Sequence, residues 1–536
     1  MVNMGSVDNL LCRILNWFAV IVLAAGVAAA QQAPPSRPQG QVKPPQTQAQ
    51  KPSPQPETRI TPEEAQRLFS SVDEILRFAS EDSRLPIRGT VKRELMSRPQ
   101  FHDFLIKKID EDPDTQRFRR TEAVLKKLSL VPRDFDLRAF LIRMLEEQVE
   151  GFYEPKTKTM YLLNWVQPEL QQPVLAHELT HALQDQNFDL EKWSEITSED
   201  APDPKQKPVL KNDPYNIEPD EERAARQSVS EGQAMVVMLD YILAPSGHTV
   251  AEAPFMAEMF KQQTLHQTEE SPILKSAPMY IRESLLFAYT FGLGFEQKLL
   301  AEGGTQLAFD AALRVPPKNT RQIMTPQAYV DREQLPPMPF PRIVPLVGKK
   351  YRSYDAGEVG QFDVYVMLKQ FADEKLADEL SDKWRGGLYW VVVRPGHQVV
   401  ENKPVEPSDL AVFYLSRWAS PDDATRFAQR YSSWLGKRYK QADRASVANA
   451  KSDFAQRVAS NTRWSTEDGP VFVEPWGQMV LVMESFDDQT AAGIREIVLG
   501  RPPAGVPRPK PSPEPAPRPL PPPPPAPHQT AMPALP

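Results

Sequence analysis

Apolar residues recur at helical spacing over the first part of the sequence. From residue 61 to residue 144 they return every three or four positions, which predicts amphipathic helices packed on a common core. The clearest segments are PEEAQRLFSSVDEILRFAS (62–80), FHDFLIKKI (101–109), TEAVLKKLSL (121–130) and DLRAFLIRMLEEQ (136–148). No chemical motif interrupts them, so their expected role is structural.

The pattern changes after the Pro-rich segment 336–348. Strands are predicted for GGLYWVVVR (386–394) and DLAVFYLSRWAS (409–420), a hairpin turning at EPWGQ for PVFVEPWGQMVLVMESF (470–486), and helices for PDDATRFAQRYSSWLGKRY (421–439) and QTAAGIREIVL (489–499). These elements indicate a small α+β domain. It carries no paired acids, nucleophile or metal cluster, so we expect it to position substrate, bind a partner or support the rest.

Proline is concentrated outside these patterns. The chain has 536 residues and 56 prolines, more than globular domains usually carry. Segments 31–58 and 501–536 are Pro-rich and nearly free of large apolar side chains, so they are expected to be extended and without a fixed fold. The sequence therefore predicts a signal peptide (1–30), a Pro/Gln-rich linker (31–60), a main domain (61–345), a small α+β domain (346–500) and a Pro-rich disordered tail (501–536).

The first thirty residues have the pattern of a secretory signal. Arg13 precedes an apolar run, ILNWFAVIVLAAGVAAA, that ends in small residues, with Ala30 as the expected last residue removed. The protein is therefore expected to be exported to a periplasmic or extracellular location. An uncleaved N-terminal membrane anchor is the alternative, and the Pro-rich tails could associate with a cell envelope.

Charge argues against a nucleic-acid partner. The formal net charge is −7, and acidic and basic residues are mixed along the chain. Proteins that bind nucleic acid usually concentrate basic residues in a patch or stripe. We therefore expect that the protein has no nucleic-acid partner.

Two of the chain's 7 histidines stand four residues apart in PVLAHELTHALQDQ (173–186). Leu, Ala, Glu and Gln favour helix here, and Pro173 is tolerated in a first turn. On such a helix the leucines fall on one side, and His177, His181 and Asp185 fall on the other. The segment predicts a helix with one packing face and one chemical face.

The stretch HELTH, residues 177–181, matches the motif H-E-x-x-H. Residues four apart lie one helical turn above each other, so both imidazoles can reach one Zn²⁺ at about 2.0–2.1 Å. Glu178 leans to the adjoining side, where it can contact a water held by the metal and act as general base. The alternative is a helix with two surface histidines and an unrelated glutamate.

A third zinc ligand has to come from further along the chain. Gln184 and Asn187 occupy the glycine and final histidine positions of the longer three-histidine motif, which excludes it. A second helix is predicted over 220–242, with Glu231 at its centre, before a run of small and apolar residues. A buried carboxylate needs a cation, and zinc supplies one, so Glu231 is the predicted third ligand. A solvated surface glutamate is the alternative, and the rival ligands are Glu221, Glu222 and Asp240. The small residues Gly232 and Ala234 should let this helix approach the histidine helix closely.

With HELTH and the downstream EGQA, the chain resembles the gluzincin metallopeptidases, in particular an exported bacterial branch of that clan. The resemblance covers about residues 150–500, and it includes GFYEPKTKTMYL (151–162), YTFGLGFEQKLLAEGG (289–304) and PPKNTRQIMTPQAY (316–329). It implies zinc bound by His177, His181 and Glu231, with Glu178 as base. The implied fold is α+β: a mainly helical zincin-like catalytic domain with an edge hairpin, followed by the smaller α+β domain.

Three further roles are expected. The segment GFYEPKTKTMYL predicts a hairpin, and an exposed strand edge beside the active-site helix could pair with an extended peptide, although a purely structural hairpin fits equally. Gluzincins often use a downstream tyrosine or histidine to stabilise the oxyanion, for which Tyr289 and His266 are candidates. Asp185 is a candidate for orienting a histidine ring.

The predicted function is an exported zinc peptidase that acts on a peptide or protein substrate. The competing hypothesis is a catalytically silent zincin-fold binding or scaffold protein of the cell envelope. Glu178 favours catalysis, because a structural zinc site needs no base beside it.

Overall fold

The computed structural model describes residues 60–111, 115–194, 214–215, 217, 219–253, 255–399, 405–444 and 463–500. The predicted signal peptide, all but residue 60 of the predicted linker, and the predicted Pro-rich tail lie outside the described residues. Within the described ranges, no helix combines the length and the apolar character that crossing a membrane requires.

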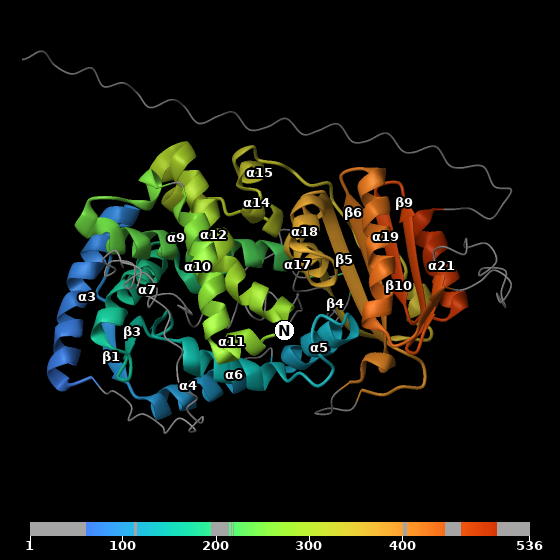
Figure 1. Cartoon of the computed structure of the whole chain (residues 1–536), viewed down its shortest axis with the longest axis horizontal. Coiled ribbons are helices and arrows are strands. Elements are labelled where there is room, and N and C mark those ends of the chain that lie inside the picture. Colours follow the sequence, from blue (N-terminus) through green and yellow to red (C-terminus); the bar gives the residue numbers. More distant parts are fainter. Residues whose placement is uncertain are drawn as a thin grey trace, which may run out of the picture.

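Helices make up most of the described chain before residue 348, as predicted (Figure 1). The four segments with helical periodicity all form helices, α3 to α6, which confirms that prediction. These helices are α3 (Pro62–Ser83), α4 (Arg98–Glu111), α5 (Thr115–Lys127), α6 (Leu137–Gln148), α7 (Pro168–Phe188), α8 (Leu190–Ser194), α9 (Asp220–Leu243), α10 (Met256–Glu270), α11 (Pro272–Ser276), α12 (Met279–Thr305), α13 (Ala312–Arg314), α14 (Thr320–Met324), α15 (Pro326–Val330) and α16 (Val344–Val347).

A three-stranded sheet lies among these helices. Its strands are β1 (Lys92–Met96), β2 (Gly151–Glu154) and β3 (Thr159–Leu163), in the order β1-β3-β2. Strands β2 and β3 are antiparallel, which confirms the predicted hairpin. Strand β1 was not predicted and pairs in parallel with β3. Every residue of β2 is buried, so this strand does not present the exposed edge that pairing with an extended peptide would need.

A seven-stranded antiparallel sheet follows, in the order β4-β5-β6-β10-β9-β8-β7. The predicted strands, hairpin and helices all form here, and the α+β class with mainly helical content is confirmed. The elements are β4 (Arg352–Glu358), α17 (Gln361–Phe371), α18 (Glu374–Ser381), β5 (Trp384–Val393), β6 (Leu410–Trp418), α19 (Pro421–Arg438), β7 (Ala442–Arg444), β8 (Arg463–Thr466), β9 (Gly469–Trp476), β10 (Met479–Glu484) and α21 (Asp488–Leu499).

Successive side chains of a strand point to opposite faces of the sheet, and on β5 residues on both faces are buried. On β5, Trp390 and Val392 belong to a core shared with α16 and α21, whereas Val391 and Val393 belong to the larger core shared with α17 and α19. Helix α19 lies against this sheet in Figure 1, where it packs on β6, β10 and β9. The larger core continues into the helical part, so the sheet and the helices pack as neighbours.

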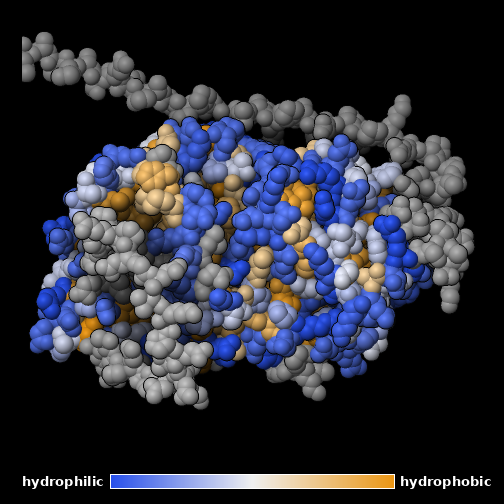
Figure 2. All heavy atoms as spheres, in the orientation of Figure 1, coloured by the Kyte–Doolittle hydropathy of each residue, from blue (hydrophilic) through white to orange (hydrophobic). Residues whose placement is uncertain are grey.

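A buried polar contact also joins the two parts. The Lys127 ammonium, at the end of α5, donates to the Ser485 hydroxyl at 2.9 Å and lies 3.4 Å from the Asp468 carboxylate. Burial lowers the pKa of Lys127 to about 8. A predicted boundary at residue 345 therefore separates two architectures that share one core. On the face drawn in Figure 2, hydrophilic residues predominate among the described ones, and apolar residues occupy smaller areas between them.

Candidate metal centre

Helix α7 carries the two histidines and is longer than predicted. It begins at Pro168, not at Pro173, and Pro173 lies inside it. Pro168 suits the first helical position, where its fixed φ angle is already helical and its missing N–H costs no bond. Pro173 removes one bond from the helix but does not end it. The prediction that Pro173 stands in the first turn was therefore wrong.

Helix α9 carries Glu231 and begins at Asp220, as predicted. Its central residues are buried, including Glu231, whose side chain is 2% exposed. The predicted use of Gly232 was wrong, because this glycine faces α12 and not the histidine helix. A Cβ atom at Gly232 would lie 2.4 Å from the carbonyl oxygen of Gly292, and one at Gly292 would lie 2.3 Å from that of Ser228. The two glycines let the backbones of α9 and α12 cross in contact.

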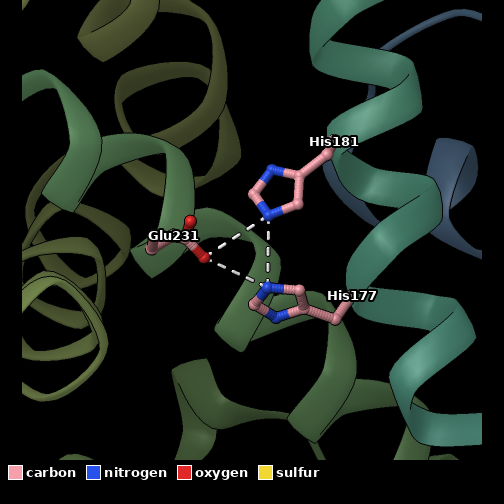
Figure 3. A group of neighbouring side chains, drawn as sticks. All are labelled: His177, His181 and Glu231. Carbon is pink, nitrogen blue, oxygen red and sulfur yellow. Dashed lines mark hydrogen bonds and ion pairs between the residues drawn. The ribbon is translucent and has the colours of Figure 1, made fainter. Parts of the chain in front are cut away.

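The three predicted ligands meet between α7 and α9 (Figure 3). The His177 Nε2 and His181 Nε2 atoms are 3.2 Å apart. One carboxylate oxygen of Glu231, Oε2, lies 3.1 Å from His177 Nε2 and 3.4 Å from His181 Nε2. All three residues are buried. The structure thus brings together three donor atoms, one from each predicted ligand, although they are separated by up to 54 residues in the sequence.

These separations fit a tetrahedral metal site. Zinc bonds of about 2.0–2.1 Å at tetrahedral angles place neighbouring ligand atoms about 3.3–3.4 Å apart. The observed separations of 3.1, 3.2 and 3.4 Å lie close to that length. Two imidazole nitrogens and one carboxylate oxygen are also a ligand set used by catalytic zinc. Among the described residues, no other group of His, Cys, Asp or Glu side chains has this arrangement.

The charges in the site favour a cation there. Burial opposes the charge of Glu231, but the neighbouring His181 and His177 rings lower the pKa of this carboxyl to about 2. Burial also opposes protonation of His181, but the Glu231 carboxylate outweighs it and raises the pKa of His181 to about 9. Burial lowers the pKa of His177. An ionised, buried Glu231 therefore draws positive charge beside it, either a proton on His181 or a metal ion.

Glu178 lies outside the ligand set. Its Oε2 atom accepts a hydrogen bond of 2.8 Å from the backbone N–H of Tyr153 on β2. Its Oε1 atom is buried and has no hydrogen-bond partner among the described residues. Burial raises the pKa of Glu178 to about 8, and the charge of Glu231 adds to that effect. One carboxylate oxygen is thus fixed by a hydrogen bond and the other is left without one, which is the arrangement that a general base needs.

Gln184 orients His181, and this role was not predicted. Its side-chain oxygen lies 2.8 Å from His181 Nδ1 and accepts from the Ser230 hydroxyl at 2.9 Å. Its side-chain nitrogen donates to the backbone oxygen of Ser230 and to the side chain of Gln233. The signal was present in the sequence, since Gln184 follows His181 by three residues and so lies on the same helical face.

Asp185, proposed from the sequence for orienting a histidine, instead binds the β2–β3 hairpin. It accepts from the Tyr153 hydroxyl at 2.8 Å and from the Lys158 ammonium at 2.6 Å, both on Oδ2. Its other oxygen accepts from the backbone N–H of Leu190. The helical wheel placed Asp185 on the correct side of α7, but it could not show which element packs there.

The two candidates for oxyanion stabilisation lie in different surroundings. Tyr289, on α12, is buried, and its ring stacks on His177 with centroids 6.3 Å apart. His266, on α10, has a side chain that is 76% exposed and lies near Glu270. Tyr289 therefore borders the candidate metal centre, whereas His266 lies on the surface.

The rival carboxylates make other contacts. Glu221 accepts from the backbone and hydroxyl of Thr320, and Glu222 pairs with Arg226 and Lys318. Asp240 accepts from the backbone N–H of Val250. None of these three joins His177 and His181 in the ligand group.

Asp82 on α3, which packs on α9, gives a prediction about stability. Burial raises the pKa of Asp82 to about 7, and the charge of Asp240 adds to the effect. This pKa in the folded protein lies above the usual value of 3.8. The protonated Asp82 carboxyl therefore makes its full contribution to the stability of the protein below about pH 4, and this contribution is lost as the pH rises through about 7. We expect Asp82→Asn to increase the free energy of unfolding by about 1–2 kcal/mol at pH 8 and by less at pH 5.

Urea unfolding at the two pH values measures this effect. Exposed Glu81 on the same helix offers the control, since Glu81→Gln removes the same charge and should change stability by less than about 0.5 kcal/mol. An Asp82→Asn variant with equal effects at pH 5 and pH 8 would contradict the assignment of a raised pKa.

Comparison with known proteins finds a match for the second part of the chain only. Residues 349–495 match the family model of a domain of unknown function (DUF8575). The match covers the seven-stranded sheet and contains none of the four residues His177, Glu178, His181 and Glu231. No curated protein and no solved structure matches the chain. The comparisons therefore say nothing about the part of the chain that carries the candidate metal centre.

Proposed function

We propose that the protein is a zinc-dependent peptidase in which His177, His181 and Glu231 hold the metal and Glu178 is the general base. The observation that carries the proposal is the group of three buried ligand atoms, 3.1–3.4 Å apart. Glu178, next to His177 in the chain, is a carboxylate with one oxygen that has no hydrogen-bond partner among the described residues. The motif resemblance to gluzincins supports the same assignment.

Each residue has a defined task in this proposal. A zinc ion, when bound, would supply a Lewis acid that polarises a peptide carbonyl and lowers the pKa of water. Glu178 would take the proton of the attacking water through Oε1 and pass it to the leaving amine. Gln184 keeps the His181 ring in place by holding Nδ1. Tyr289, stacked on His177, is the proposed hydrogen-bond donor to the oxyanion.

The substrate and the location belong to the same proposal. A peptide or protein substrate follows from the peptidase chemistry, and export follows from the N-terminal signal-like sequence. The second candidate, a silent binding or scaffold protein, would keep the metal without hydrolysing peptides.

The first test is metal content. We expect about one zinc per purified chain, and a loss of most of it in Glu231→Ala, because that variant removes one of three ligands. Glu222→Ala is the control: it removes a carboxylate from the same helix that pairs with Arg226 and Lys318, so the zinc content should not change. Elemental analysis of the dialysed proteins measures all three.

The possible results separate the hypotheses. A wild-type protein that takes up no added zinc would overturn the metal site. Unchanged zinc in Glu231→Ala would overturn the role of Glu231. Zinc at one per chain, together with no cleavage across a diverse peptide library, would favour the binding or scaffold protein.

A further inference from the structure

Strand β2 contacts the general base through its backbone. It is the last strand in the order β1-β3-β2, so within the described part of the chain one of its edges has no neighbouring strand. Tyr153 stands opposite Met160 of β3, but its N–H donates to Glu178 Oε2 on α7 at 2.8 Å. The free edge of the strand is thus turned to the catalytic helix. On this edge, the N–H of Tyr153 is already bound to Glu178.

The same hairpin holds α7 at a second point. The Tyr153 hydroxyl donates to Asp185 Oδ2 at 2.8 Å, and Lys158, in the hairpin turn, donates to the same atom at 2.6 Å. Asp185 follows Glu178 by seven residues, or about two helical turns. Tyr153 therefore binds α7 at two points: its backbone N–H binds Glu178, and its side chain binds Asp185 two turns later. Both acceptor side chains are buried.

We infer that Tyr153 is a positioning residue, whose backbone N–H fixes the general base and so sets the direction of its reactive oxygen. The inference rests on the proposed function for its catalytic consequence. With Oε2 held by the strand, rotation of the carboxylate is restricted and Oε1 remains the oxygen available to water. Strand β2 then contributes to the reaction through Glu178, and not by pairing with an extended substrate.

Proline tests the N–H directly. Tyr153→Pro removes the side chain and the N–H, whereas Tyr153→Ala removes the side chain and keeps the N–H. Because this N–H points away from β3, proline does not break the sheet ladder. We expect Tyr153→Pro to have a kcat about tenfold or more below that of Tyr153→Ala, with KM within about twofold and the same zinc content. Tyr153→Phe, which loses only the bond to Asp185, should stay closer to the wild type. Equal kcat values for the proline and alanine variants would overturn the inference.

Hydrogen exchange gives a second test that needs neither activity nor a folded proline variant. The amide of Tyr153 in full-length protein should exchange about tenfold or more faster in Glu178→Ala than in the wild type, because its acceptor is gone. The amide of Phe152, which stands opposite Tyr161, is the internal control and should not change. Unchanged exchange at Tyr153 would overturn the inference. A wild type that hydrolyses no peptide would instead overturn the proposed function, and hydrogen exchange would still decide whether Tyr153 holds Glu178.

Discussion

Replacing Glu178 with glutamine is expected to lower kcat for peptide hydrolysis by about 10²–10⁴-fold or more while the zinc content stays at the wild-type level. Glutamine has the shape of glutamate but cannot take a proton from water. Its amide oxygen can still accept the N–H of Tyr153, so the side chain keeps its anchor. The variant separates proton transfer from metal binding.

Metal binding should survive because Glu178 is not one of the ligands. The proposed ligand group consists of His177, His181 and Glu231, and among the described residues no other His, Cys, Asp or Glu side chain joins it. Removing the negative charge of Glu178 changes the field at the site, but the ionised Glu231 remains beside both imidazoles.

Steady-state kinetics on a cleaved library peptide, with elemental analysis of the same samples, measures the effect. Glu191→Gln is the matched control: the same chemical change, on exposed α8, should leave kcat unchanged. Equal hydrolysis by the wild type and Glu178→Gln would contradict the role of general base. Loss of zinc in Glu178→Gln would show that this carboxylate supports the metal and that the activity loss has another cause.

The residues of the candidate metal site could be predicted because their signals are local. Spacing of four residues on a helix places His177 and His181 on one face, whatever the rest of the fold does. Glu231 could be predicted because the apolar residues after it indicated burial, and a buried carboxylate needs a positive partner. The structure brings the three residues within 3.4 Å of one another as these two arguments require.

The wrong predictions concern which neighbouring element a residue packs against. Sequence periodicity gives the direction of a side chain on its own helix but not the element it meets. Gly232 was therefore assigned to the contact with α7 although it contacts α12, and Asp185 was assigned to a histidine although it binds the hairpin. The parallel pairing of β1 with β3 joins residues more than sixty positions apart, for which the sequence offered no local signal. The zinc, the peptidase activity and the export stay predictions.

The helix crossing of α9 and α12 leads to the second large effect. A methyl group added at Gly292 would lie 2.3 Å from the backbone carbonyl oxygen of Ser228. A methyl group added at Gly232 would lie 2.4 Å from that of Gly292. Such a contact cannot be relieved by rotating a side chain, so the two backbones must move apart. We expect Gly292→Ala to lower the free energy of unfolding by at least about 2–3 kcal/mol, and Gly232→Ala to do the same.

Gly294 provides a control on the same helix. A Cβ atom there would meet nothing within 4 Å, so Gly294→Ala should stabilise the protein by about 0.5–1 kcal/mol through its better helix propensity. Urea unfolding of the three variants measures the contrast between a crossing glycine and an ordinary one. A Gly292→Ala variant as stable as Gly294→Ala would show that the helices do not cross at this distance.

Gly292→Ala should also lower the affinity of the candidate metal centre for zinc, although the described contacts of Gly292 include none of the three proposed ligands. Glu231 precedes Gly232 on α9, and α9 is held between α7, which carries the histidines, and α12. Moving α9 away from α12 changes its position against α7, and a metal site tolerates about 0.2 Å in its ligand distances. We therefore expect Gly292→Ala to bind zinc at least about tenfold more weakly than Gly294→Ala, in a titration at a temperature where both are folded. Equal affinities together with a large loss of stability would mean that α9 keeps its position on α7 and that α12 alone moves.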